Sequence, residues 1–124
     1  MLIRVLLVAV GGSLGASARY LTSLLAGRLF GAVFPAGTLL VNLGGCLLIG
    51  LGFSMAERGI ISPAGRLLLL TGFLGGFTTF STFALETITY LADGARSLSL
   101  LNLALNNGAG LLLVVVGLWL GRVV

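Results

Sequence analysis

Apolar residues dominate four long stretches of the chain, and short polar segments separate them. The stretches run from about Leu2 to Leu25, Phe34 to Ala56, Arg66 to Leu91 and Leu98 to Leu120. A helix needs about 20 mostly apolar residues to cross the hydrocarbon core of a bilayer, and each stretch is long enough. The segments between them are too short to hold a folded domain. The pattern predicts an all-α membrane protein in which residues 1–124 form one transmembrane domain of four helices.

The first stretch also admits a second interpretation. Residues 1–18, MLIRVLLVAVGGSLGASA, combine an arginine, an apolar segment and an Ala16-Ser17-Ala18 sequence similar to a signal-peptide cleavage site. However, Gly11 and Gly12 interrupt the apolar segment, and cleavage would leave three spans. We therefore favour an uncleaved first helix.

Composition narrows the class of protein. Hydrophobic residues make up 58% of the chain, and charged residues only 8%, whereas charged residues make up about 25% of an average soluble domain. The seven arginines are spread along the chain, so they form no basic patch of the kind that binds nucleic acid. One cysteine, Cys46, and no histidine exclude an internal disulfide and the usual transition-metal ligand sets.

The arginines also bear on the orientation of the chain in the membrane. Alternating the ends of the spans places them on two sides: Arg4, Arg58, Arg66 and Arg122 on one, and Arg19, Arg28 and Arg96 on the other. Orientation follows the Lys/Arg bias across short loops, and here the two sides differ by one residue. We expect insertion in both orientations and an antiparallel homodimer with its two-fold axis in the membrane plane. The alternative is that one orientation dominates.

Glycines are frequent, and several are four residues apart. The chain has 20 glycines, with pairs at Gly11/Gly15, Gly27/Gly31, Gly72/Gly76 and Gly117/Gly121. Small residues at this spacing allow the backbones of membrane helices to approach closely. We therefore assign most of these glycines to helix packing.

The segment GGFTTFSTF, residues 75–83, is unusual because it lies inside the third apolar stretch. Two glycines followed by Thr78 and Thr79 weaken a helix and free backbone carbonyls. Freed carbonyls at membrane depth are tolerated only where protein or water surrounds them, and broken helices commonly mark ion sites. Carbonyl oxygens suit a hard cation such as Na⁺. The sequence thus predicts a broken third helix, and two breaks can meet at the axis of an antiparallel dimer.

Phe80 and Phe83 follow the break and share one face of the next helix, because they are three residues apart. Such residues usually pack against apolar neighbours. However, a phenyl ring has a positive edge, so two edges can also face a small anion. Uncharged hydrogen-bond donors accompany the rings: Ser81, Thr82, the amide of Asn42 and, one turn before it, Thr38. Donors without fixed charge suit a pathway that an anion must both enter and leave.

Four motifs resemble the CrcB/Fluc family of bacterial fluoride channels over essentially the whole chain. They are GGSLGASARY (11–20), GTLLVNLGGCLLIG (37–50), TGFLGGFTTFSTFALE (71–86) and LLNLALNNGAG (100–110), of which the third is the most specific. The resemblance implies a dual-topology homodimer in the bacterial inner membrane, with two fluoride pores. It also implies passive export of fluoride from the cytoplasm.

The resemblance further implies roles for individual residues. Phe80 and Phe83 match the pore phenylalanines, and Asn42 matches the pore asparagine. Gly75 and Thr78 match positions whose backbone carbonyls, from both subunits, hold a structural Na⁺ that is not transported. The remaining matches are the hydroxyl residues Ser81, Thr82 and Thr38, the vestibule arginine Arg19, and Glu86, the acid that ends the third motif. Glu86 is equally consistent with an acid that extends to the membrane interface.

The sequence departs from the family's pattern in two ways. Phe77 occupies a position where many members have leucine, and a ring there can simply pack. Asn102 and Asn106 occupy fourth-span positions where many members have tyrosine and serine lining the pore. We expect both asparagines to lie on the fluoride pathway, because an unpaired amide facing lipid is costly.

Other functional classes fit the sequence less well. A small dual-topology proton-coupled multidrug exporter needs a mid-membrane acid, but Glu86 lies near the end of its span and Asp93 in a loop. A membrane assembly protein that transports nothing does not need the hydroxyl-rich break. No nucleophile–base pair or cofactor motif indicates an enzyme. We therefore predict that donors from Asn42, Ser81 and Thr82, with the edges of Phe80 and Phe83, replace the hydration shell of fluoride stepwise.

Overall fold

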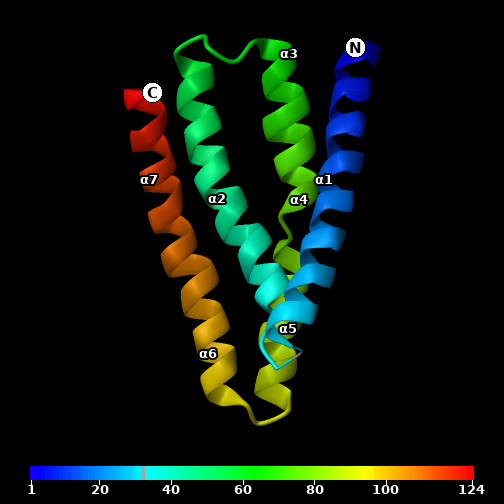
Figure 1. Cartoon of the computed structure of the whole chain (residues 1–124), viewed down its shortest axis with the longest axis vertical. Helices are drawn as coiled ribbons and strands as arrows, with labels where there is room; N and C mark the ends of the chain where they lie inside the picture. Colours follow the sequence, from blue (N-terminus) through cyan, green and yellow to red (C-terminus); the bar gives the residue numbers. More distant parts are fainter. Residues whose placement is uncertain (32) are drawn as a thin grey trace.

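The computed structural model describes residues 1–31 and 33–124, and the described part is helical throughout its regular structure (Figure 1). The first two spans are α1 (Leu2–Phe30) and α2 (Ala36–Glu57). The third contains α3 (Pro63–Gly65), the π-helical η1 (Arg66–Leu74), α4 (Gly75–Phe77) and α5 (Phe80–Ala92). The fourth contains α6 (Arg96–Ala104), the π-helical η2 (Leu105–Ala109) and α7 (Gly110–Val123). Among the described residues, four helical spans are long and apolar enough to cross a membrane, which confirms the predicted number.

The end of α1 differs from the prediction. The apolar pattern placed it near Leu25, but the helix continues to Phe30 and ends at Gly31, which has a φ of 76°. Glycine adopts this left-handed conformation at low cost and commonly ends helices. As a result, Arg19 lies eleven residues before the end of α1, roughly 16 Å along the axis. Arg19 is therefore inside the span and no longer counts toward either end of the spans. The remaining arginines number four at one end and two at the other.

Most of the predicted glycine pairs bring the backbones of neighbouring helices into contact. The pair Gly27/Gly31 is an exception, because a Cβ atom at either residue would meet nothing within 4 Å. On α1, a Cβ atom at Gly11 or Gly15 would overlap backbone carbonyl oxygens of η1. Between α2 and α7, a Cβ atom at Gly50 or Gly117 would overlap the backbone of the facing helix. Both helix pairs are in backbone contact, and small residues permit this close approach.

The third span breaks at Thr78 and Thr79. Both residues are extended, with φ and ψ of −82° and 160° at Thr78 and −150° and 112° at Thr79. Figure 1 shows the ribbon narrowing to a coil there, between α4 and α5. Above the break the span packs mainly against α1, and below it α5 packs against α6. The structure therefore contains the break that the sequence predicts.

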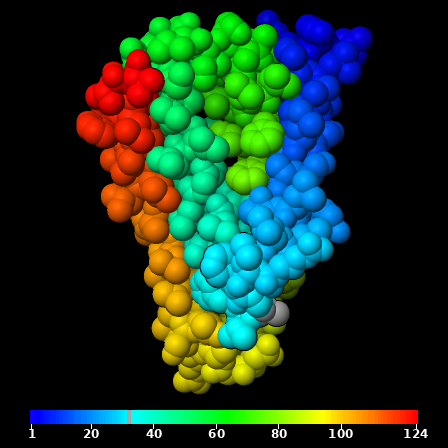
Figure 2. Space-filling model, viewed as in Figure 1, coloured from blue at the N-terminus to red at the C-terminus, as the bar shows by residue number. Residues whose placement is uncertain are grey.

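Little of the apolar surface is buried within one chain. The buried hydrophobic residues are Ala26, Val41, Leu70, Leu74 and Phe83. The helices diverge toward the end that holds both termini (Figure 1), and the face in Figure 2 is hollowed between α2 and the third span. Phe80 is 76% exposed although it lies in the middle of a span. Much of this surface is therefore left to contact lipid or another protein chain.

Candidate functional site

Asn42 of α2 holds the backbone of the break. Its Nδ2 donates to the carbonyl oxygen of Thr79 at 3.1 Å, and the N–H of Thr79 donates to Oδ1 of Asn42 at 2.8 Å. The amide side chain thus replaces the backbone partners that Thr79 loses where the helix stops. Buried backbone groups need such partners, because an unpaired group costs about 1–3 kcal/mol.

A chain of amide groups extends from Asn42 to the fourth span. The second proton of its Nδ2 is donated to Oδ1 of Asn106 at 2.9 Å. Asn106 in turn donates to Oδ1 of Asn102 at 2.9 Å, and Asn102 donates to Oγ1 of Thr87 at 3.0 Å. Thr87 donates back to the carbonyl of Phe83 at 2.8 Å. This amide chain, Asn42–Asn106–Asn102–Thr87, links α2, the fourth span and α5 through paired polar groups.

Thr79 is a site residue that the sequence interpretation missed. Its hydroxyl caps α5 by accepting from the N–H of Thr82 at 3.3 Å, and it donates to Oγ1 of Thr82 at 2.9 Å. Ser81 is more loosely placed, with its Oγ 3.5 Å from Oγ1 of Thr79. Threonine is a preferred residue at the start of a helix, so a predicted break followed by a new helix is the signal that points to it.

A cavity of about 360 Å³ adjoins the break. Its lining includes both predicted phenylalanines and two of the predicted asparagines: Phe80, Phe83, Asn42 and Asn106. The two rings meet edge to face, with centroids 5.5 Å apart. Asn102 is not among the lining residues, since it is fully buried within the amide chain. The structure thus brings the phenylalanines to one cavity with Asn106, while Asn102 supports Asn106 from behind.

A second cavity has a volume of about 430 Å³, and Thr82 lines it, whereas its hydrogen-bond partner Thr79 lines the first cavity. Thr38, Thr82 and Glu86 line it together. The hydroxyl of Thr38 donates to Oε1 of Glu86 at 2.7 Å, whereas the buried Oε2 has no hydrogen-bond partner among the described residues. Glu86 is six residues from the end of α5. It therefore lines this cavity next to predicted pathway residues.

The carbonyls of Gly75 and Thr78 are released by the break. The N–H of Thr79, the usual helical donor to Gly75, is taken by Asn42. Among the described residues, no backbone N–H donates to the carbonyl of Thr78, and its one protein donor is Nη1 of Arg19 at 3.4 Å, a long hydrogen bond. A Cβ atom at Gly75 would meet nothing within 4 Å. Oxygen atoms of this kind fit a hard cation, but one chain offers too few to surround it.

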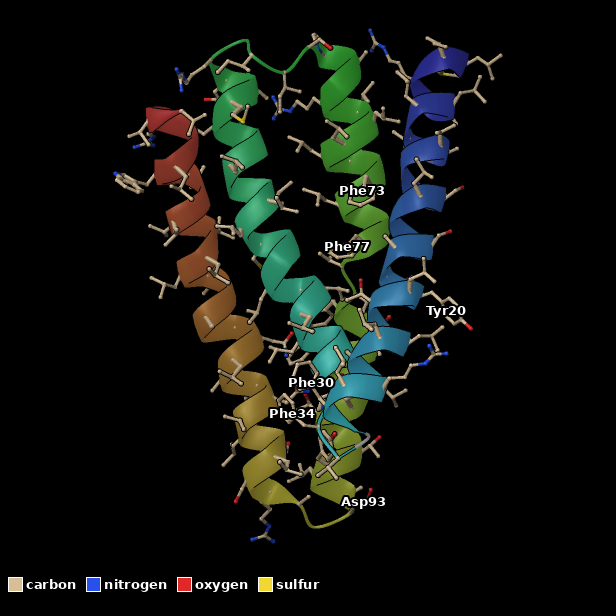
Figure 3. All side chains as sticks on the ribbon, in the orientation of Figure 1. Tyr20, Phe30, Phe34, Phe73, Phe77 and Asp93 are labelled. Carbon is tan, nitrogen blue, oxygen red and sulfur yellow. The ribbon has the colours of Figure 1, made fainter. Side chains whose placement is uncertain are left out.

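Phe77, the residue that departs from the family's pattern, packs. Its ring stacks on that of Phe73, with centroids 5.7 Å apart and ring planes 13° apart (Figure 3). Phe77 also lies near Gly44 of α2, where a Cβ atom would be 3.9 Å from the ring. Neither Phe73 nor Phe77 is among the residues that line the cavity at the break.

Comparison with known proteins gives a match over most of the chain. A family model described as CrcB-like protein, Camphor Resistance (CrcB), matches residues 6–118. The "Fluoride-specific ion channel FluC" of Clostridium perfringens (strain 13 / Type A) is 49% identical over 124 residues, which cover 98% of this chain and 96% of that protein. The FluC of Shewanella frigidimarina is 46% identical and covers 91% of both chains. That of Maridesulfovibrio salexigens is 41% identical, over 96% of this chain and 95% of the relative.

Proposed function

This chain belongs to the CrcB-like family, and from that membership we propose that it is a fluoride-selective channel through which fluoride leaves the cytoplasm passively. The observation that carries the proposal is the likeness, over nearly its whole length, to proteins named fluoride-specific ion channels. These relatives are channels, so the chain is not an enzyme. With four membrane-spanning helices it is a multi-pass membrane protein, and we place it in the bacterial inner membrane.

The proposed pathway joins the two cavities beside the break. Fluoride enters the cavity lined by Thr38, Glu86 and Thr82, passes the hydroxyl of Thr82, and reaches the rings of Phe80 and Phe83. Ser81 lines neither cavity, but its hydroxyl lies next to that of Thr79. Thr82 accepts a hydrogen bond from Thr79, so its own hydroxyl proton remains available to an anion. Positive ring edges and hydroxyl donors replace the water that the ion loses. No fixed positive charge among these groups holds the ion in place.

We assign Asn42 a different part in this pathway from the one that the sequence suggested. Both protons of its amide are already donated, one to Thr79 and one to Asn106. Its contribution to fluoride transport is therefore to hold the break and Asn106 in position. Direct donation to fluoride falls to groups with free protons, such as Thr82 and Ser81.

A second copy of the chain, in the opposite orientation, completes the proposed channel. Phe80 and Gly75 are exposed in the single chain, as expected of residues that meet a partner at the axis. Carbonyls of Gly75 and Thr78 from both copies would hold a structural Na⁺, which supplies positive charge that ties the two breaks together. With Arg19 inside α1, the arginine difference between the two ends is four against two. It remains a bias of only two residues, which is compatible with insertion both ways. The antiparallel dimer then contains two pores.

Phe80→Ile should reduce fluoride flux about tenfold, which corresponds to about 1.4 kcal/mol added to the barrier. Isoleucine is apolar like phenylalanine but lacks a ring edge. Phe30→Ile is the matched control, because Phe30 is 65% exposed at the last turn of α1 (Figure 3) and lines neither cavity. Flux is measured on dimers of each variant in liposomes. Equal flux in Phe80→Ile and wild type would remove the ring edge from the mechanism.

Growth in fluoride tests the function in cells. A bacterium without a fluoride exporter of its own should tolerate more fluoride when it expresses this chain, because passive export lowers cytoplasmic fluoride. An exporter of drugs would instead raise tolerance to cationic drugs and leave fluoride sensitivity unchanged. That second pattern would reject the proposed function.

A further inference from the structure

An additional pocket lies at the membrane edge where α1 and the third span begin. It has a volume of about 510 Å³ and contains none of the predicted pathway residues. In Figure 1 the N-terminus and α3 lie at the same end of the molecule, opposite to the connections from α1 to α2 and from α5 to α6. The lining includes Arg4, Arg66, Ile3, Leu7, Leu67 and Thr71.

Two arginines line this pocket without an acidic neighbour. Arg4 is the third residue of the first span and Arg66 is the fourth residue of the third span, so both lie within about 6 Å of a helix start. The three acidic residues of the chain are elsewhere. In the described part of the chain, the side-chain hydrogen bonds of arginines belong to Arg19 and Arg58. The pocket therefore carries two positive charges at headgroup depth that the protein does not neutralise.

The environment of Arg66 leaves it able to bind an oxyanion. Its guanidinium carbon is 5.2 Å from the centroid of the Phe53 ring. Phe53 belongs to α2 and is not among the residues that line the pocket. A cation–π contact of this kind uses none of the N–H donors of the guanidinium, so they remain available for hydrogen bonds. The fork of N–H groups on arginine matches the oxygens of a phosphate.

Apart from Thr71, the rest of the lining is apolar. Ile3, Leu7 and Leu67 adjoin the arginines, and Ile3 is 66% exposed. A free phosphate ion would leave these side chains uncovered, whereas an acyl chain would cover them. We propose that this pocket binds an anionic phospholipid, with its phosphate at Arg4 and Arg66 and part of an acyl chain on the apolar residues. Basic pockets between membrane helices bind lipid headgroups in this way.

Native mass spectrometry of the purified full chain tests this proposal, with phosphatidylglycerol titrated against the protein in detergent. Arg4→Gln combined with Arg66→Gln should weaken phosphatidylglycerol binding about 25-fold, at about fivefold per arginine. Arg28→Gln combined with Arg96→Gln removes the same charge from the other end of the molecule and should leave binding unchanged. Phosphatidylcholine, which has no net charge, should bind wild type no more tightly than it binds the first double variant.

Several results would overturn the proposal. The first is unchanged phosphatidylglycerol binding when Arg4 and Arg66 are both replaced by glutamine. The second is wild-type affinity for phosphatidylcholine equal to that for phosphatidylglycerol. The third is displacement of the lipid by inorganic phosphate, which would make a free anion the occupant. If the glutamine variant does not fold, Arg4→Lys with Arg66→Lys keeps both charges and should retain binding. Wild-type affinity must also fall between about 50 mM and about 500 mM NaCl, because salt screens the contact; salt-independent binding would reject the site.

Discussion

Asn42→Leu is expected to destabilise the protein by about 3 kcal/mol, at roughly 1 kcal/mol for each group left unpaired. Leucine has nearly the size of asparagine but neither donates nor accepts. The substitution therefore leaves the N–H and carbonyl of Thr79 and the Oδ1 of Asn106 without their partner. The loss should lower the midpoint of thermal unfolding by about 10 °C. It is measured by heating purified protein and following the loss of the folded species by size-exclusion chromatography.

Asn107→Leu is the matched control for this substitution. Asn107 lines the same cavity, but its amide donates to the carbonyl of Leu103 in its own helix and the residue is exposed. Its replacement should change the unfolding midpoint little. Fluoride flux should fall in the Asn42 variant below its unfolding temperature as well, because the break loses its fixed shape. An Asn42→Leu protein as stable as wild type would contradict the claim that hydrogen bonds from the Asn42 amide hold the backbone of the break.

Gly15→Ala is expected to have the largest effect on folding of the α1 substitutions. The new Cβ atom would overlap the carbonyl of Phe73, which is backbone and cannot move aside as a side chain does. Relief requires α1 and η1 to separate along their contact, at a cost of about 1–3 kcal/mol or more. We expect the variant to accumulate poorly in membranes and to lose its dimer at lower temperature than wild type.

Gly27→Ala, on the same helix, should change stability in the opposite direction. A Cβ atom at Gly27 meets nothing within 4 Å. Alanine in a helix is favoured over glycine by about 0.5–1 kcal/mol, so this variant should be slightly more stable than wild type. If both variants shifted stability equally, α1 and η1 would not be in backbone contact at Gly15.

The four spans and the break were predictable because they depend on local sequence. Apolar runs set the number of spans, and the step from Gly75-Gly76 to Thr78-Thr79 marks the break. The end of α1 was not predictable from the apolar pattern. Gly27 and Arg28 interrupt the pattern without ending the helix, whereas Gly31 ends it through its backbone conformation.

The candidate site was predictable in its composition but not in its connections. The amide of Asn42 was expected to be a free donor, and only the fold shows that both of its protons are already used. Asn102 was expected to lie on the fluoride pathway, and only the fold shows that it is fully buried behind Asn106. Which partner an amide meets depends on how the second and fourth spans face the break, and side-chain pairing across spans leaves no periodic trace in the sequence. Arg19 likewise looked like an end-of-span charge and instead lies beside Thr78.

Fluoride efflux from liposomes that hold the purified protein tests the central claim most directly. Vesicles loaded with fluoride are followed with a fluoride electrode, and matched vesicles are loaded with chloride. The account predicts rapid fluoride release that requires a potassium ionophore to balance charge, with no release of chloride. Folded dimers that release no fluoride, or that release chloride equally well, would contradict a fluoride-selective pathway at the break.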